Sequence, residues 1–113
     1  MHELSLMEAV REQALEQARA HGGGRIAAIR LRIGSLAGVE PEALRLAHAV
    51  VMAGTAAEGS VLQIDTVPAR FHCEPCGQPF HAAQGDCICP RCGAFSRQLL
   101  QGRELELTAL ELS

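Results

Sequence analysis

The stretches CEPCG at residues 73–77 and CPRCG at residues 89–93 decide how the centre of this chain folds. Each CxxC turn presents two thiolates from one tight loop, and the glycine that follows lets the backbone turn around a metal ion. Twelve residues separate the two turns, so four sulfurs can meet in the tetrahedral geometry that zinc accepts, with Zn–S distances of about 2.3 Å. The spacing therefore predicts a structural Zn(II) site made of Cys73, Cys76, Cys89 and Cys92.

Two other interpretations of these cysteines stay open at this point. Two disulfides would need an oxidising compartment, but the opening MHELSLMEAVREQ lacks the basic and apolar regions of a secretory signal. We therefore expect a cytoplasmic protein with reduced thiols. A rubredoxin-type iron site uses the same spacing and is not excluded by it. A zinc hydrolase is excluded, because four thiolates close the coordination sphere to water, and we expect no enzyme activity.

Length and charge narrow the classes of partner. A chain of 113 residues forms about one small domain, although a metal can replace the core of a second, smaller lobe. No apolar run approaches the roughly 18 residues of a membrane span. The net charge is −3 and the chain has no Trp or Tyr, whereas nucleic-acid binding uses a basic face and stacking aromatics. We expect neither membrane nor nucleic acid as a partner, and we keep a zinc-ribbon adaptor for protein or nucleic acid as the alternative function.

Hydrophobic periodicity predicts an amphipathic helix over residues 5–20. Ser5 and Glu8 have the form of a capping box, so the helix is expected to begin just after Leu4 and to leave residues 1–3 as a free tip. Its end is marked by three consecutive glycines. The apolar stripe of this helix consists of Met7, Val10, Ala14 and Ala18.

The remaining elements complete an α+β pattern. Apolar alternation predicts strands over residues 25–33, 61–67 and 104–112, and Pro41 is well placed to begin a second helix that ends at Gly54. The sequence therefore predicts two helices on a three-stranded mixed sheet, with a zinc-ribbon-like module inserted before the last strand.

The predicted domains follow from this order. Residues 1–69 and 101–113 form the first domain, which carries the candidate nickel residues described next, and residues 70–100 form the zinc module.

The N-terminal tip is the second chemical feature. The amine of Met1, the amide nitrogen of His2 and the His2 imidazole can close two fused chelate rings, and three nitrogens in one plane suit Ni(II) or Cu(II). Glu3, through its carboxylate or its amide, or Glu40 can supply the fourth donor. The Irving–Williams order favours copper at such a site, and any chain that begins Met-His has these atoms. The residues alone therefore leave a solvated terminus open.

Several stretches together resemble one family. The opening MHELSL, the segments RIAAIRLRIGSLAGVEPEAL and GTAAEGSVLQI, and the paired CxxC turns are similar to the hydrogenase maturation factors of the HypA/HybF family, from residue 1 to about residue 112. The resemblance implies a nickel metallochaperone that helps insert nickel into the large subunit of NiFe-hydrogenase and, in some bacteria, serves urease. It implies Ni(II) as transferred cargo at His2, with Glu3 and Glu40 as the acidic neighbours, and Zn(II) at the four cysteines.

The resemblance also implies partners. These are the GTPase HypB, the precursor of the NiFe-hydrogenase large subunit and, where urease is the client, the urease maturation proteins; a homodimer is left open. The chain departs from the family pattern at Leu46-Ala47-His48-Ala49, where aromatic and acidic residues are usual. This departure weakens the expectation of a partner contact through the second helix. Cys87 is an additional thiol.

Overall fold

The computed structural model describes residues 3–82 and 86–113. The strands form two three-stranded sheets, with the orders β2-β1-β6 and β4-β3-β5. Within the described ranges, no helix is long and apolar enough to cross a membrane. The elements along the chain are α1 (Glu3–Ala20), β1 (Ile26–Gly34), α2 (Pro41–Met52), β2 (Val61–Val67), β3 (Arg70–Cys73), β4 (Gln78–His81), β5 (Gln98–Gln101) and β6 (Leu105–Leu112).

The chain divides into two compact units. The helical unit consists of Met1–Leu31, Gly38–Asp65 and Glu106–Ser113, and the cysteine unit consists of Arg32–Ala37 and Thr66–Leu105. The domain limits that we predicted after residues 69 and 100 stay predictions, since compactness does not test whether the parts fold separately.

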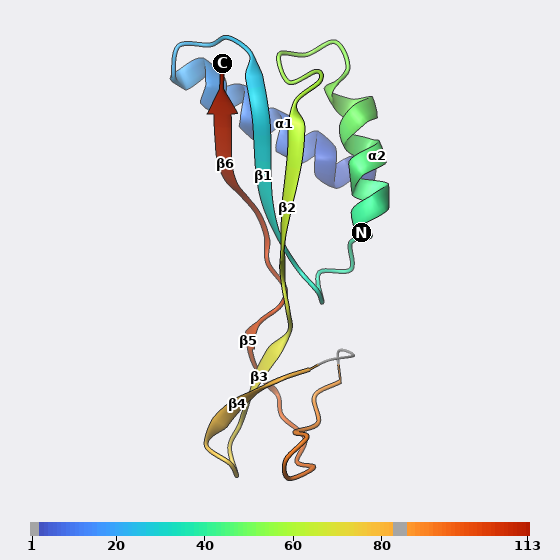
Figure 1. Ribbon diagram of the computed structural model, residues 1–113, viewed down its shortest axis with the longest axis vertical. Coiled ribbons are helices and arrows are strands. Elements are labelled where there is room, and N and C mark those ends of the chain that lie inside the picture. The colour runs from blue at the N-terminus through green and yellow to red at the C-terminus, as the bar shows by residue number, and fades with distance from the viewer. Residues whose placement is uncertain (1–2, 83–85) are drawn as a thin grey trace. The chain divides into compact units, whose positions relative to one another are not determined.

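In the helical unit, α1 and α2 pack against each other beside the sheet β2-β1-β6 (Figure 1). The predicted stripe of α1 is buried along its whole length. In β1 the apolar Ile29 and Leu31 are buried whereas Arg30 is exposed, so the predicted wet face of this strand is confirmed. On that face Arg30 pairs with Asp65 of β2 at 2.9 Å. The periodicity of the sequence therefore identified the core of this unit correctly.

The start of α1 was predicted wrongly. The helix begins at Glu3 and not after Leu4, so Ser5 lies inside the first turn. A physical reason is that a carboxylate in the first turn is stabilised by the helix dipole. The Glu3 carboxylate also accepts a hydrogen bond from the backbone N–H of Glu40, at 3.0 Å. Glu3 is therefore part of the fold and not of a free tip.

In the cysteine unit, β3 pairs in antiparallel fashion with β4 on one side and with β5 on the other. The rings of Phe71 and Phe80 stack with centroids 5.9 Å apart. They belong to a small core with Cys73, Cys89 and two alanines, Ala69 and Ala82. Among the described residues, this buried cluster has six members, which is a small core, and a bound metal is the usual supplement in such cases.

Two glycines allow a close backbone approach within the cysteine unit. The Leu36 N–H donates to the Gly102 carbonyl at 2.7 Å. A Cβ atom added to Gly34, at the end of β1, would lie 2.1 Å from the carbonyl carbon and oxygen of Gly102. Only glycine fits at position 34, because the clashing atoms are backbone and cannot rotate away.

Candidate metal centres

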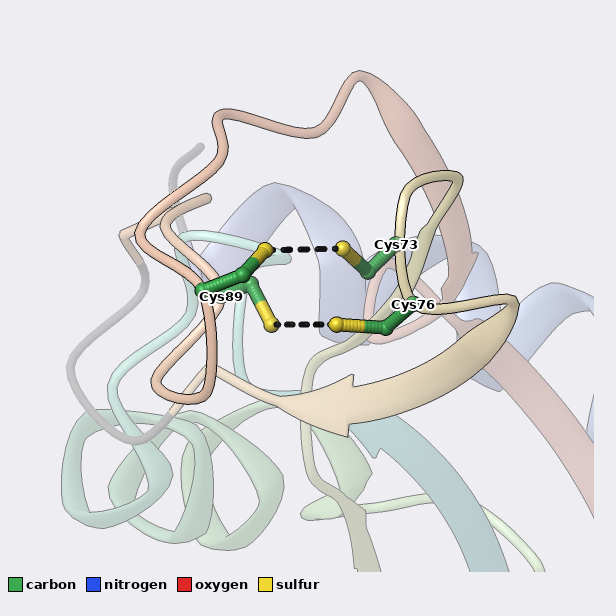
Figure 2. Close-up of side chains that lie close together, drawn as sticks. Cys73, Cys76 and Cys89 are labelled. Carbon is green, nitrogen blue, oxygen red and sulfur yellow. Dashed lines mark hydrogen bonds between the residues drawn. The ribbon is translucent and has the colours of Figure 1, made fainter.

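The four predicted zinc ligands come together in the cysteine unit. Their sulfur atoms all lie within 4.8 Å of one another. The sulfurs of Cys73 and Cys92 are 3.5 Å apart, and those of Cys76 and Cys89 are 4.0 Å apart. Figure 2 shows the side chains of Cys73 and Cys76 pointing across a gap toward the turn that carries Cys89. Among the described residues, this is the group of His, Cys, Asp and Glu side chains that could share a metal ion.

The two CxxC turns have the same local structure. In each, the N–H of the glycine after the second cysteine donates to the carbonyl of the first cysteine, at 2.8 Å for both Gly77 and Gly93. These glycines have φ angles of 66° and 77°, in the left-handed region that other residues rarely adopt. The role predicted for the glycine of each turn is confirmed, and the repeated turn explains why the thiols face a common centre.

The sulfur positions fit a tetrahedral metal and not a pair of disulfides. Zn–S bonds of about 2.3 Å place the sulfurs of a tetrahedron about 3.8 Å apart. The recorded separations of 3.5 and 4.0 Å bracket this value. A disulfide needs about 2.05 Å, and all five cysteines are free. The donor set, four thiols on two rigid turns, therefore suits a thiophilic metal ion.

The electrostatics of the cluster also favour a cation. Burial raises the pKa of the Cys89 thiol, but hydrogen bonds from the backbone of Cys92 and Arg91 outweigh it and lower the pKa to about 6. A backbone hydrogen bond from Cys76 lowers the pKa of Cys73, but burial and the neighbouring thiols outweigh it and raise the pKa to about 12. The protein alone thus favours some thiolates and opposes others, and full ionisation of the group needs a positive charge among them.

The candidate nickel residues are described only in part, because Met1 and His2 lie outside the described residues. Glu3 and Glu40, which are 37 positions apart in the sequence, are brought together by the hydrogen bond of 3.0 Å between the Glu3 carboxylate and the Glu40 N–H. Glu40 is the N-cap residue of α2, and its own side chain makes no capping hydrogen bond. The Glu3 carboxylate of α1 therefore contacts the backbone at the start of α2, a contact that the sequence did not indicate.

Two residues outside the predicted sites have notable surroundings. His48 of α2 is buried, and its Nε2 lies 2.9 Å from the hydroxyl oxygen of Ser60. Burial, and then the nearby charge of Arg45, lower the pKa of His48. Arg91 lies between Cys89 and Cys92, and its side chain donates to the backbone carbonyls of Gln78 and Pro79, just after the first CxxC turn. Sequence reasoning missed Arg91, because nothing in CPRCG shows where the arginine points.

The fold and the site define a class: a small metal-binding α+β protein with a four-cysteine unit. The profile of the family described as "Hydrogenase/urease nickel incorporation, metallochaperone, hypA" matches residues 1–112. The chain belongs to this family, which consists of nickel metallochaperones and not of enzymes.

Relatives agree with this assignment, and two solved structures have a similar fold. The chain is 46% identical over 112 residues to the hydrogenase maturation factor HypA of Acidithiobacillus ferrooxidans, covering 99% of both chains. It is 45% identical over 116 residues to that of a Synechococcus species, again covering 99% of both. The solution structure of the Ni metallochaperone HypA from Helicobacter pylori matches with a TM-score of 0.69 and 21% identity, over 99% of this chain and 97% of that one. A second solution structure of a HypA protein matches with a TM-score of 0.72 and 21% identity, over 100% of this chain and 97% of the other. These two structures bear on the fold, and they confirm the predicted α+β class.

Proposed function

We propose that this protein captures Ni(II) at its N-terminus and delivers it for the maturation of NiFe-hydrogenase. The observation that carries the proposal is the match of residues 1–112 to the nickel incorporation family. Nickel is the cargo in this account, so the site must bind it and also release it. A chain terminus suits that task, because an incoming ligand can replace one donor at a time.

The capture site would use three nitrogens: the Met1 amine, the His2 amide and the His2 imidazole. Together they close one five-membered and one six-membered chelate ring, which favours a square-planar ion. The fourth donor would come from Glu3 or Glu40. The hydrogen bond from Glu40 to the Glu3 carboxylate supports a division of roles, in which that carboxylate holds the start of α1 at the start of α2. In this division, the fourth donor would be the Glu3 amide or the Glu40 carboxylate.

The cysteine unit would hold a resident Zn(II) through Cys73, Cys76, Cys89 and Cys92. Zinc bound to four thiolates has no open position, so its contribution is to the folding of the unit and not to chemistry on a substrate. The small core of this unit supports the proposal, and so do the sulfur separations of 3.5 and 4.0 Å, which lie close to the roughly 3.8 Å expected around zinc. Iron would accept the same four thiolates as zinc, and analysis of the bound metal distinguishes the two elements.

Delivery needs a protein partner, and the helical unit offers a surface near Glu3. Leu46 and Val50 of α2 are 72% and 69% exposed, and Leu4 of α1 is 49% exposed. With Glu3 and Ala43 these side chains line one open depression. Apolar side chains gathered in this way are typical of protein-binding surfaces. We propose the GTPase HypB and the large-subunit precursor as partners, in the cytoplasm, with urease maturation as a further client.

The proposal is tested by the nickel content of the hydrogenase large subunit. A bacterium lacking its own HypA is complemented with this protein, with His2→Ala, or with His21→Ala as a matched control. His21 is an exposed histidine just after α1, and its Nδ1 lies 2.9 Å from the Gln17 carbonyl oxygen. We expect the unaltered protein and His21→Ala to restore nickel insertion, and His2→Ala to fail. Equal restoration by all three would contradict capture at the N-terminus.

A further inference from the structure

One arginine connects the two CxxC turns. Arg91 lies in the second turn, and its Nη2 donates to the carbonyl oxygens of Gln78 at 3.3 Å and Pro79 at 3.2 Å. These two residues begin β4, directly after the first turn. A single side chain of the second turn is therefore bonded to the backbone that directly follows the first turn.

Arg91 also affects the net charge around the metal. Four thiolates around one divalent ion leave a net charge of −2, obtained as −4 for the thiolates plus +2 for the metal. The Arg91 guanidinium interacts electrostatically with both Cys76 and Cys89, and therefore offsets part of that charge. Arg97 has the same charge and lies five residues beyond Cys92, but its guanidinium stacks 5.9 Å from the Phe95 ring.

The chemistry of arginine suits this position better than that of lysine. Its planar fork can hold two carbonyl oxygens while remaining close to a sulfur, whereas an ammonium group is a single point of charge. Hydrogen bonds and charges just outside a metal's ligands typically change its affinity 10–100-fold. Loss of the contact frees the two turns to separate, and separation exposes the sulfurs to a competing chelator.

We propose that Arg91 is a positioning residue that holds the two CxxC turns together and slows the release of their metal. The inference rests on the zinc part of the proposed function. It adds that a residue other than the four ligands helps to determine how slowly the metal is released. It also assigns the arginine of CPRCG a role that its neighbour in the turn, Pro90, does not share.

The test is the rate of zinc release from zinc-loaded protein to an excess of chromogenic chelator at constant neutral pH. We compare the unaltered protein with Arg91→Gln, Arg91→Lys and the matched control Arg97→Gln. We expect release from Arg91→Gln to be about tenfold faster or more, release from Arg91→Lys to be intermediate, and Arg97→Gln to match the unaltered protein. Labelling of the zinc-loaded proteins with iodoacetamide should show Cys76 reacting faster in Arg91→Gln.

The controls separate this inference from the zinc assignment. Metal analysis first establishes one zinc per unaltered chain; its absence would refute the zinc site itself. With zinc present, equal release rates for the unaltered protein and Arg91→Gln would overturn the role of Arg91 alone. If Arg91→Gln cannot be loaded with zinc, the comparison uses Arg91→Lys. That variant must release zinc faster than the unaltered protein, and an equal rate would overturn the inference.

Discussion

Replacing Glu3 by alanine should loosen the start of both helices of the helical unit. The Glu3 carboxylate accepts the N–H of Glu40 at 3.0 Å, and Glu40 is the N-cap residue of α2. In a capping box, a glutamate in the third position of the same helix accepts this N–H, but that position of α2 is Ala43. Glu3 therefore supplies from α1 the capping group that the sequence of α2 lacks.

The expected loss of stability in Glu3→Ala is the sum of two contributions. One hydrogen bond contributes about 0.5–1.5 kcal/mol, and a carboxylate at a helix N-terminus contributes about 0.3–1 kcal/mol. We expect Glu3→Ala to lower the free energy of unfolding by about 1–2 kcal/mol, which corresponds to a fall in Tm of about 4–8 °C for a chain of this size. Glu3→Gln keeps an acceptor oxygen and loses the charge, so it should lose only about 0.5 kcal/mol.

The assay is thermal unfolding of untagged, zinc-loaded protein followed by circular dichroism. Glu8→Ala is the matched control, since Glu8 is an exposed glutamate one turn further along α1 and should change the free energy of unfolding by less than about 0.5 kcal/mol. Equal Tm values for Glu3→Ala and Glu8→Ala would refute the reasoning, because the contact with Glu40 would then contribute nothing.

Three further predictions concern other parts of the chain. Gly34→Ala should lower the free energy of unfolding by more than about 2 kcal/mol in denaturant titration, because its Cβ would meet the Gly102 backbone; an unchanged midpoint would contradict this. The pKa of His48 is lowered in the folded state, so the unfolded state binds more protons below about pH 6.5, and stability should fall as the pH drops from there toward the lowered value. His48→Gln should flatten that dependence, and identical pH profiles for the two proteins would refute the assignment. Removing the metal with a chelator, or replacing Cys73 by serine, should increase hydrogen exchange at the amides of β3 while those of α1 stay protected; a uniform increase over both would show that the metal stabilises the whole chain.

The sequence predicted those features that depend on local pattern. The stripe from Met7 to Ala18, the alternation in β1 and the two CxxC turns each repeat at a spacing that belongs to one kind of structure. The three strands β3, β4 and β5 were not predicted, because each has four residues and too few alternations to show a period. Their pairing also depends on the cysteine turns between them.

The features that escaped prediction depend on contacts between distant residues. The capping box at Ser5 and Glu8 is a local signal, and it predicted a helix start after Leu4. The helix begins at Glu3 instead, where the side chain contacts Glu40, 37 positions further along the chain. Arg91 contacts β4 across the cysteine cluster, and its direction follows only from the folded turns. For Met1 and His2, which lie outside the described residues, the nickel assignment stays a prediction.

The most direct test of the account is nickel titration of the untagged, zinc-loaded protein beside His2→Ala, by calorimetry and visible absorption. We predict that the unaltered protein binds one equivalent of Ni(II) with a square-planar spectrum. His2→Ala should lose both the binding and the spectrum and still retain its zinc. Equal binding by the two proteins would remove His2 from the site and contradict nickel capture at the N-terminus.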